Sequence, residues 1–382
     1  MNAPRQHDLF VSCAPALEPL LHRELQQLGF ADAKAAYRGV YVPYRDVYDA
    51  LFRINYCSRL ATRVLLPLIR FRCQGRDDLY RIASAFAWEK YIPKGRTFAI
   101  DANVSHPSLR NALFAAQVVK DAICDQLRQT RGFRPSIDVA APDVQLNLFI
   151  HGPSASLSID SSCVALHKRG YRQFGGQAPL QEVLAAAALT LAGWHGQEPL
   201  CDLCCGTGTF LCEAALIATD TAPGFLRQRF GFMLFPGYST EAWLKVKREI
   251  DAKRRPLAKG LLVGVDSDFQ AIRACKANMR ACGFGEQIAV YEKDLAEFVP
   301  AIAPRLVLAN PPHGERLGKG QPLESTYRAL GDWISTHTAR PARAFILLSN
   351  LDLCSAIALP EVKRHRFISG GDSKTLIEYR LP

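Results

Sequence analysis

The pattern of apolar and polar positions changes character near residue 160. Before that point, short apolar strands alternate with amphipathic helices, and glycine-rich motifs are absent. Between residues 16 and 28, for example, leucines recur at helical spacing and a glycine follows. The pattern predicts strands at Asp8 to Ser12, Val40 to Pro43, Arg63 to Phe71, Thr97 to Val104, Ile137 to Val139, Val144 to His151 and Ala155 to Asp160, and helices at Ala16 to Leu28, Asp46 to Ile54, Asp77 to Ala87 and Asn111 to Gln129.

After residue 160, an apolar run leads into a glycine-rich turn. Glu198 to Leu203 predicts a strand, the turn C-C-G-T-G-T-F follows, and Leu211 to Ala218 predicts a helix; Gln181 to Ala192 predicts a helix before it. Glycines at such a turn let the backbone approach a ligand, and the helix start offers unpaired N–H groups. A nicotinamide-binding fold also begins this way, but its third glycine is missing. We expect cofactor contacts from Asp202, Cys204, Gly206 and Gly208, and also from Asn310 further along the chain.

Two further apolar runs end in carboxylates. Gly260 to Val265 precedes Asp266 and Asp268, and Ile288 to Tyr291 precedes Asp294. An acidic residue at the end of such a strand is placed to bind a ribose diol, and Asp294 is placed to accept from an adenine amino group. Taken singly, each carboxylate is also typical of a helix cap or a solvated strand end.

A fourth apolar run, Leu306 to Ala309, is followed by Asn310-Pro311-Pro312-His313. The amino group of a nucleobase is a poor nucleophile, because its lone pair is delocalised into the ring. The Asn310 side-chain carbonyl and the Pro311 carbonyl can accept its N–H groups and direct the lone pair toward an incoming methyl group. The prolines stiffen the turn, and His313 can stack on the base. Alone, the motif also fits a rigid loop.

The order of these motifs is that of an S-adenosylmethionine-dependent methyltransferase with a doubly wound sheet. The length of 382 residues predicts two or three domains, and 48% hydrophobic residues predict a globular chain. A formal charge of +11 favours a nucleic-acid partner over a merely basic surface. No apolar run reaches membrane-spanning length and the polar start lacks a signal-peptide core, so we expect a cytoplasmic protein.

The twelve cysteines are scattered along the chain. Cys201, Cys204 and Cys205 form one C-x-x-C on the predicted cofactor turn, without a second pair at zinc spacing, so we expect no metal. Some base methyltransferases attack a ring carbon with a cysteine. Those enzymes place the cysteine where this chain has Asn310 to His313, and the absence of a cysteine there disfavours that chemistry.

Basic residues gather in three places that we expect to contact RNA. The predicted strand from 63 to 71 and its end supply arginines, and the segment L-H-K-R-G-Y-R joins the halves of the chain. The insertion Asp220 to Lys259 interleaves basic and aromatic residues, which favours RNA binding over a plain surface helix. The joining segment also fits a solvated linker, and the N-terminal part a dimerisation domain. The predicted RNA-binding residues are Arg63, Arg70, Arg72, Lys168, Arg169, Tyr171 and Arg172.

The chain resembles the THUMP-domain class I methyltransferases that modify guanine at N2 in 23S ribosomal RNA, the RlmL-like family. The resemblance rests on F-V-S-C-A-P-A-L-E-P-L-L, L-H-K-R-G-Y-R, A-P-L-Q-E-V-L-A-A-A, D-L-C-C-G-T-G-T-F-L-C-E-A-A and N-P-P-H-G-E-R-L-G. It implies a ferredoxin-like cap at 1–55, a THUMP RNA-binding domain at 56–160 and a Rossmann-like catalytic domain at 161–382. It implies that Asp202, Gly206 and Gly208 hold the methionine part of the cofactor, Asp266 the ribose and Asp294 the adenine, and that Asn310, Pro311 and His313 hold the base.

The chain departs from this family at two positions: His313 replaces the usual Tyr, and Leu203 replaces the Pro after the first Asp. Longer members carry a second methyltransferase domain, so one activity is expected here. Alternatives within enzymes are a tRNA guanine or an adenine amino group as target. From another class, the chain fits an RNA-binding ribosome-assembly factor with a vestigial site.

Overall fold

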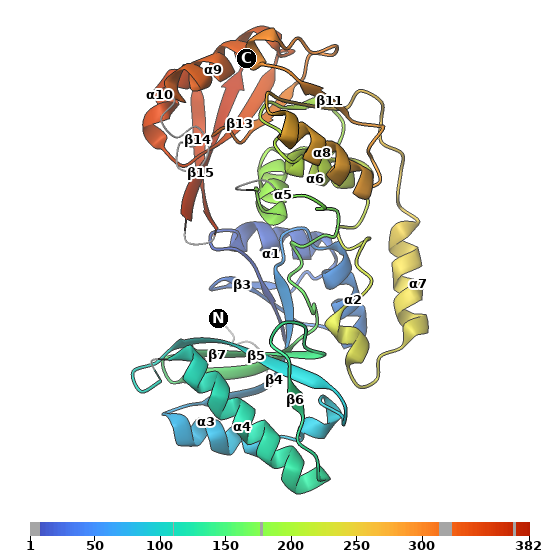
Figure 1. Ribbon diagram of the computed structural model, residues 1–382, viewed down its shortest axis with the longest axis vertical. Helices are drawn as coiled ribbons and strands as arrows, with labels where there is room; N and C mark the ends of the chain where they lie inside the picture. Colours follow the sequence, from blue (N-terminus) through green and yellow to red (C-terminus); the bar gives the residue numbers. More distant parts are fainter. Residues whose placement is uncertain (1–7, 110, 176–178, 313–322, 370–371) are drawn as a thin grey trace.

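The computed structural model describes residues 8–109, 111–175, 179–312, 323–369 and 372–382. It is elongated, with the sheet of the C-terminal half at one end and strands of the N-terminal half at the other (Figure 1). Helices α1 (Glu18–Gln27) and α2 (Val47–Cys57) lie between the two. Among the described residues, no helix is both long and apolar enough to cross a membrane.

The N-terminal half is built on one eight-stranded sheet in the order β2-β3-β1-β4-β8-β7-β5-β6. The strand β4 runs through both parts of this sheet, because it pairs with β1 at Ser12↔Arg63 and with β8 at Arg72↔Ser154. Helices α3 and α4 pack together beneath β5. The bounds are β1 (Leu9–Ser12), β2 (Lys34–Ala36), β3 (Gly39–Val42), β4 (Arg63–Arg72), β5 (Thr97–Ser105), β6 (Ser136–Ile137), β7 (Val144–His151), β8 (Ser154–Asp160), α3 (Arg76–Ser84) and α4 (Ala112–Arg131), with a 3-10 turn η1 (Trp88–Lys90).

Local sequence signals set the helix ends in this half. Asp46 caps α2 by accepting from the backbone of residues 48 and 49, and Asn111 caps α4 in the same way. Gly132 ends α4 in the left-handed conformation, with φ of 70°. The predicted elements of this half are present within a few residues, whereas β2 was not predicted.

The C-terminal half carries a seven-stranded sheet in the order β11-β10-β9-β12-β13-β15-β14. The strands from β11 to β13 are parallel, and β15 runs antiparallel to both of its neighbours. The bounds are β9 (Leu200–Asp202), β10 (Leu262–Asp266), β11 (Ala289–Glu292), β12 (Leu306–Ala309), β13 (Ala342–Leu348), β14 (Glu361–Ser369), β15 (Asp372–Leu381), α5 (Glu182–Leu191), α6 (Thr209–Ala218), α7 (Thr240–Asp251), α8 (Phe269–Ala281), α9 (Leu323–His337) and α10 (Cys354–Ile357), with 3-10 turns η2 (Gly231–Leu234), η3 (Leu295–Glu297) and η4 (Leu351–Leu353).

This sheet is doubly wound, and its winding reverses at β9. The chain passes from β9 to β10 and β11 on one side, and then returns to β12 on the other side of β9. In such sheets the crevice for a ligand lies at the carboxyl ends of the strands where the order reverses. The predicted fold class, a Rossmann-like domain behind an α+β module, is confirmed.

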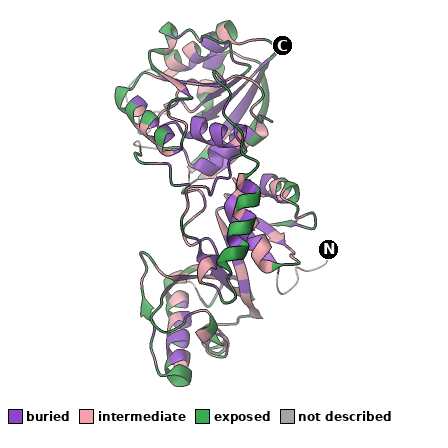
Figure 2. Cartoon of the chain, turned by 90° about the vertical axis from the view of Figure 1, so that its right-hand side faces the viewer, coloured by how far each residue is buried: buried purple, intermediate pink, exposed green. Residues whose placement is uncertain are grey.

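The insertion between α6 and β10 folds back onto the N-terminal half. Its helix α7 packs against α2, and Tyr56 donates a hydrogen bond to Asp251 at 2.8 Å. The aromatic rings of the insertion are internal: Phe230 and Phe232 are fully buried, and Trp243 lies 5.4 Å from the ring of Phe52. The prediction that the aromatics of this insertion contribute to RNA binding is wrong for those rings, because they are buried in the contact between the insertion and α2. Buried residues occur in this middle part of the molecule as well as at its two ends (Figure 2).

Candidate cofactor and base site

The strand register brings three of the predicted motifs to one level. Asp202 at the end of β9 pairs with Gly264 of β10 on one side and with Leu308 of β12 on the other. Asp266 and Asn310 each lie two residues beyond those partners. The glycine-rich turn, the acidic strand end and the Asn-Pro-Pro turn therefore leave the same edge of the sheet from three adjacent strands.

Positive backbone angles shape the glycine-rich turn. Gly206 has φ of 51° and Gly208 has φ of 82°, in the region that other residues seldom adopt. A Cβ on Gly208 would lie 2.5 Å from the Sγ of Cys275 in α8. The turn is tied to the neighbouring strand because the Gly206 N–H donates to Asp266 Oδ2 at 2.8 Å. Cys204 lies half-buried on this turn, and burial raises the pKa of its thiol well above the usual range.

Asp202 is the most unusual group of the site. Its side chain is buried, and neither carboxylate oxygen has a partner with good hydrogen-bond geometry among the described residues, although the nearby Cys204 N–H partly lowers its pKa. Burial, and then the negative charge of Asp266, holds the pKa of Asp202 well above its usual range. An unpaired buried carboxylate is costly, so this arrangement suits a ligand that carries a cationic amino group. The predicted assignment of the methionine amino group of S-adenosylmethionine to Asp202 and of its ribose diol to Asp266 stays a proposal.

Asp202→Asn is expected to stabilise the ligand-free protein while weakening cofactor binding. Replacing the unpaired carboxylate by a neutral amide should add about 1 kcal/mol to the free energy of unfolding, or about 1–2 °C in Tm. Because the folded pKa is raised, wild-type and variant should be equally stable below about pH 4, and the gap should widen as the pH rises toward the raised pKa of Asp202. Thermal melts across pH, with the exposed-site variant Asp332→Asn as control, measure this. A less stable variant at neutral pH would contradict it.

The other predicted carboxylates have partners of their own. Asp266 Oδ1 accepts from the Asp268 N–H at 3.0 Å, whereas Asp268 accepts from Gln270 N at 2.7 Å and so caps α8. Asp294 caps η3 by accepting from Ala296 N at 2.9 Å. Only Asp266 of these three reaches the glycine-rich turn, so Asp266 is the better placed of the pair Asp266 and Asp268 for a ribose.

Large apolar side chains beside these carboxylates were missed at the sequence level. Phe269 is 56% exposed at the start of α8, and Tyr291 is 40% exposed at the end of β11. Their exposure next to Asp266 gives a flat apolar surface of the kind that an adenine ring stacks on. The sequence marks neither ring by a periodic pattern: Phe269 follows Asp268, and Tyr291 is the last residue of a predicted strand.

The Asn-Pro-Pro turn is held from below by α9. Pro311 is buried, Asn310 and Pro312 are half-buried, and the Tyr327 hydroxyl donates to the Pro312 carbonyl at 3.2 Å. Burial raises the pKa of Tyr327, so the phenol keeps its proton and stays a donor. His313 lies outside the described residues, and its predicted stacking on the base stays a prediction.

The segment from 168 to 172 holds the glycine-rich turn in place through hydrogen bonds of Arg172. The Arg172 guanidinium donates to Thr207 Oγ1 at 3.1 Å and Thr209 Oγ1 at 3.0 Å, and it forms an ion pair with Glu182 at 2.9 Å. Asn278 of α8 also holds the turn, by donating to the Thr207 carbonyl at 3.0 Å. Arg172 therefore supports the cofactor turn, whatever else it contacts.

Two residues of that segment cannot serve as the sequence predicted. Arg169 is 1% exposed and pairs with the fully buried Glu213 at 3.3 Å, and the Tyr171 hydroxyl donates to the same carboxylate at 3.1 Å. Both lie beneath the surface that RNA could reach, which corrects their predicted RNA contact. Lys168 is exposed, so its contact with RNA stays a prediction.

The three arginines of β4 differ in their exposure and in the groups that they contact. Arg63 forms an ion pair with the buried Asp160. The Arg70 guanidinium lies 5.0 Å from the centre of the Tyr41 ring, and Arg72 is exposed at the strand end. Contact with RNA stays a prediction for all three, and the exposed Arg72 is the most accessible.

The cysteines behave as small apolar residues where the structure describes them. All twelve are free thiols, and most are buried. Within the described ranges, no group of three His, Cys, Asp or Glu side chains could hold a metal ion.

The doubly wound sheet with its glycine turn, acidic strand ends and Asn-Pro-Pro turn defines a Rossmann-like methyltransferase domain behind an RNA-binding module. Family models match in the same order: an RlmL ferredoxin-like domain at residues 8–65, a THUMP domain at 74–160 and an RMKL-like methyltransferase domain at 169–375. The chain belongs to this RMKL-like methyltransferase family. The predicted resemblance is confirmed, while the boundaries at 55 and 160 stay a proposal.

Individual relatives agree with this assignment. The chain is 36% identical over 98% of its length to a ribosomal RNA large subunit methyltransferase K/L of Saccharophagus degradans, of which it covers 51%. It therefore spans about half the length of that relative. It is 35% identical to slr0064 of Synechocystis, provisionally named an RNA methyltransferase, and covers 96% of it. The crystal structure of SMU.472, described as a methyltransferase and complexed with SAH, is 25% identical with a TM-score of 0.86, and the match covers 98% of this chain and 97% of that one.

Proposed function

We propose that the chain transfers a methyl group from S-adenosylmethionine to the exocyclic amino nitrogen, N2, of a guanine in RNA, with 23S ribosomal RNA or its precursor as substrate. The observation that carries this proposal is the register of β12 on β9, which sets Asn310 beside the strand end that bears the unpaired carboxylate of Asp202. The names of the K/L relatives and the THUMP match support RNA as the partner.

One set of residues in this site binds the cofactor, and another set binds the base. Bound S-adenosylmethionine supplies an electrophilic methyl group on a sulfonium centre. Asp202 pairs with the cationic amino group of the donor, Asp266 accepts from the ribose hydroxyls, and the glycines at 206 and 208 allow close approach of the backbone. On the other side, the Asn310 side-chain carbonyl and the Pro311 carbonyl accept the N–H groups of the guanine amine.

Positioning provides most of the expected rate enhancement. Accepting both amine hydrogens aims the nitrogen lone pair at the methyl carbon, and the proline ring fixes the turn before the base arrives. Tyr327 adds to this rigidity through its bond to the Pro312 carbonyl. The amine becomes acidic once it is methylated, so no dedicated base is required.

Methylation of ribosomal RNA from a strain lacking this chain tests the proposal. The purified protein should transfer label from the methyl donor, and mass spectrometry of digested RNA should find N2-methylguanosine. N6-methyladenosine, or methylation of tRNA alone, would instead assign one of the alternative targets. No binding of S-adenosylmethionine in calorimetry would favour an RNA-binding assembly factor and overturn the proposal.

A further inference from the structure

A cavity of about 660 Å³ lies between the ferredoxin-like part and the catalytic domain, apart from the predicted site. Its walls come from α1, α2 and the turn after α2 on one side, and from the carboxyl-terminal ends of α5, α6 and α7 on the other. Apolar side chains such as Leu28, Leu60 and Ile217 line part of it.

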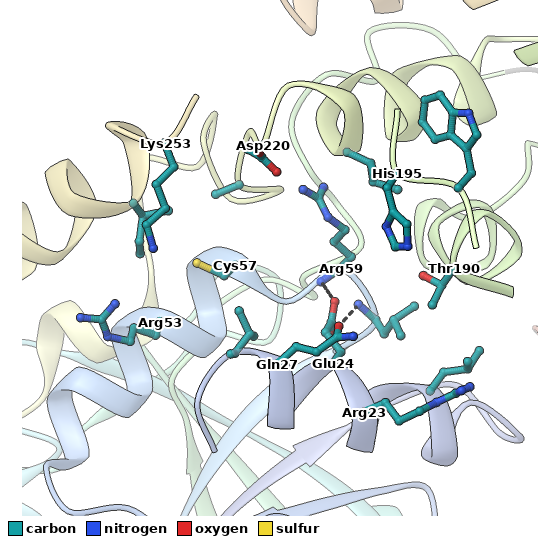
Figure 3. A pocket seen from close by; sticks show the side chains of 17 residues that line it. Arg23, Glu24, Gln27, Arg53, Cys57, Arg59, Thr190, His195, Asp220 and Lys253 are labelled. Atoms are coloured by element: carbon teal, nitrogen blue, oxygen red, sulfur yellow. Dashed lines mark hydrogen bonds between the residues drawn. The ribbon is translucent and has the colours of Figure 1, made fainter. Parts of the chain in front are cut away.

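Cations outnumber carboxylates on the walls of this cavity. Arg23, Arg53, Arg59 and Lys253 face only Glu24 and Asp220, and His195 is a further lining residue. Figure 3 shows the Arg59 guanidinium between Asp220 and His195, with Lys253 and Arg23 on opposite sides. The cavity therefore carries a positive charge made by both domains.

Its carboxylates are already engaged. Glu24 accepts from the Ser58 hydroxyl at 2.5 Å and from Arg59 N at 2.7 Å, which turns it toward the chain after α2. Asp220 forms an ion pair with Arg255 at 3.2 Å. Among the described residues, neither carboxylate forms a side-chain ion pair with Arg23, Arg59 or Lys253, although the charge of Glu24 acts on Arg59.

Three of the cations, Arg23, Arg59 and Lys253, form no ion pair among the described residues and could bind an anion. Arg59 bonds only to backbone carbonyls through Nη2, and its Nη1 is buried without a partner among the described residues. Burial lowers the pKa of Arg59 although the charges of Glu213 and Glu24 act in the opposite direction, so a further anion at the cavity would be stabilising. Arg23 and Lys253 are exposed, and no ion pair involves them in the part of the chain that the structure describes. Arg53, by contrast, pairs with Asp49 and Glu249.

We propose that this cavity binds a phosphate group that Arg23, Arg59 and Lys253 hold between the two domains. Guanidinium and ammonium groups are the usual protein donors to phosphate, and the charge comes from segments far apart in the sequence. The phosphate comes either from the backbone of bound RNA or from a free phosphorylated metabolite such as a mononucleotide. This binding does not depend on which base is methylated, or on methyl transfer itself.

The double variant R23A/K253A tests the proposal with little risk to folding, since both side chains are exposed. The charge-matched control is R340A/R380A, whose side chains are also exposed but lie at the ends of β13 and β15. Calorimetry with inorganic phosphate and with guanosine 5′-monophosphate is combined with filter binding of ribosomal RNA across salt concentrations, using the full chain.

If the phosphate belongs to RNA, R23A/K253A should weaken RNA binding about tenfold near 0.1 M salt and reduce the slope of log K against log salt by about one, while the control changes affinity less than about twofold. If it belongs to a free ligand, the mononucleotide should bind wild-type and control but not R23A/K253A, with RNA affinity unchanged. No binding of either small probe, together with equal RNA affinity for both double variants, would overturn the proposal. Methyl transfer, measured separately, reports on the proposed function instead.

Discussion

Asn310→Ala is expected to lower kcat by at least about 10²–10³-fold, which is the usual cost of removing one aligned polar group from a reacting centre. The loss should fall on kcat rather than on cofactor affinity, because the Asn310 carbonyl acts on the amine of the base. Single-turnover methylation of ribosomal RNA measures the first quantity, and calorimetry with S-adenosylmethionine measures the second.

A conservative variant makes this test sharper. Asn310→Asp keeps an acceptor oxygen, so it should retain more activity than Asn310→Ala. Thermal melts of both variants show whether the turn still folds. If Asn310→Ala lost cofactor binding and thermal stability together with activity, the residue would be structural. Full activity in Asn310→Ala would remove the Asn-Pro-Pro turn from the mechanism.

Arg169→Ala is expected to lower the free energy of unfolding by about 3–5 kcal/mol, since it leaves the Glu213 carboxylate buried without its counter-ion. The ion pair is shielded from solvent, with side-chain exposures of 1% and 0%. Arg169 Nη2 also donates to the Arg59 carbonyl at 2.5 Å, so its removal loosens the joint between the two halves. Chemical denaturation of the full chain measures the loss.

The neighbouring residue supplies the control for this prediction. Lys168 is exposed, so Lys168→Ala should change stability by less than about 0.5 kcal/mol and act on RNA binding alone. Replacing both partners, as in R169M/E213L, should recover part of the stability, because apolar pairs often substitute for buried ion pairs while the Tyr171 hydroxyl loses its acceptor. A stable Arg169→Ala variant with weakened RNA binding would show that the guanidinium faces RNA after all.

The sheet edge that carries the candidate site could be predicted from sequence because its signals are local, whereas α9 and the strands β13 to β15 were not predicted. Each of β9, β10, β11 and β12 is a short apolar run that ends in glycine, a carboxylate or Asn-Pro, and parallel strands bring such ends to one edge. The order of the runs was enough to predict the sheet edge and the relation of Asp202, Asp266 and Asn310.

The errors concern residues whose partners lie far away in the sequence. Arg169 and Glu213 are separated by 44 positions, and nothing in L-H-K-R-G-Y-R shows that one of its cations is neutralised inside the protein. The aromatics of the insertion were read as a surface for RNA, although Phe232 packs on Phe52 of α2 with ring centres 4.9 Å apart. Composition reveals charge and aromatic content, but only the tertiary fold shows which side chains are internal.

The strand β4 has a mechanical consequence. Because β4 pairs with β1 of the cap and with β8 of the THUMP part, bending between these parts would break its backbone hydrogen bonds. The described residues of the N-terminal half should therefore move as one rigid body. The aromatic contact between α2 and the insertion also fixes this N-terminal half against the catalytic half. The span between an RNA anchor on the sheet and the methyl-transfer corner is thereby fixed, so the protein would select its nucleotide by measuring along the folded RNA.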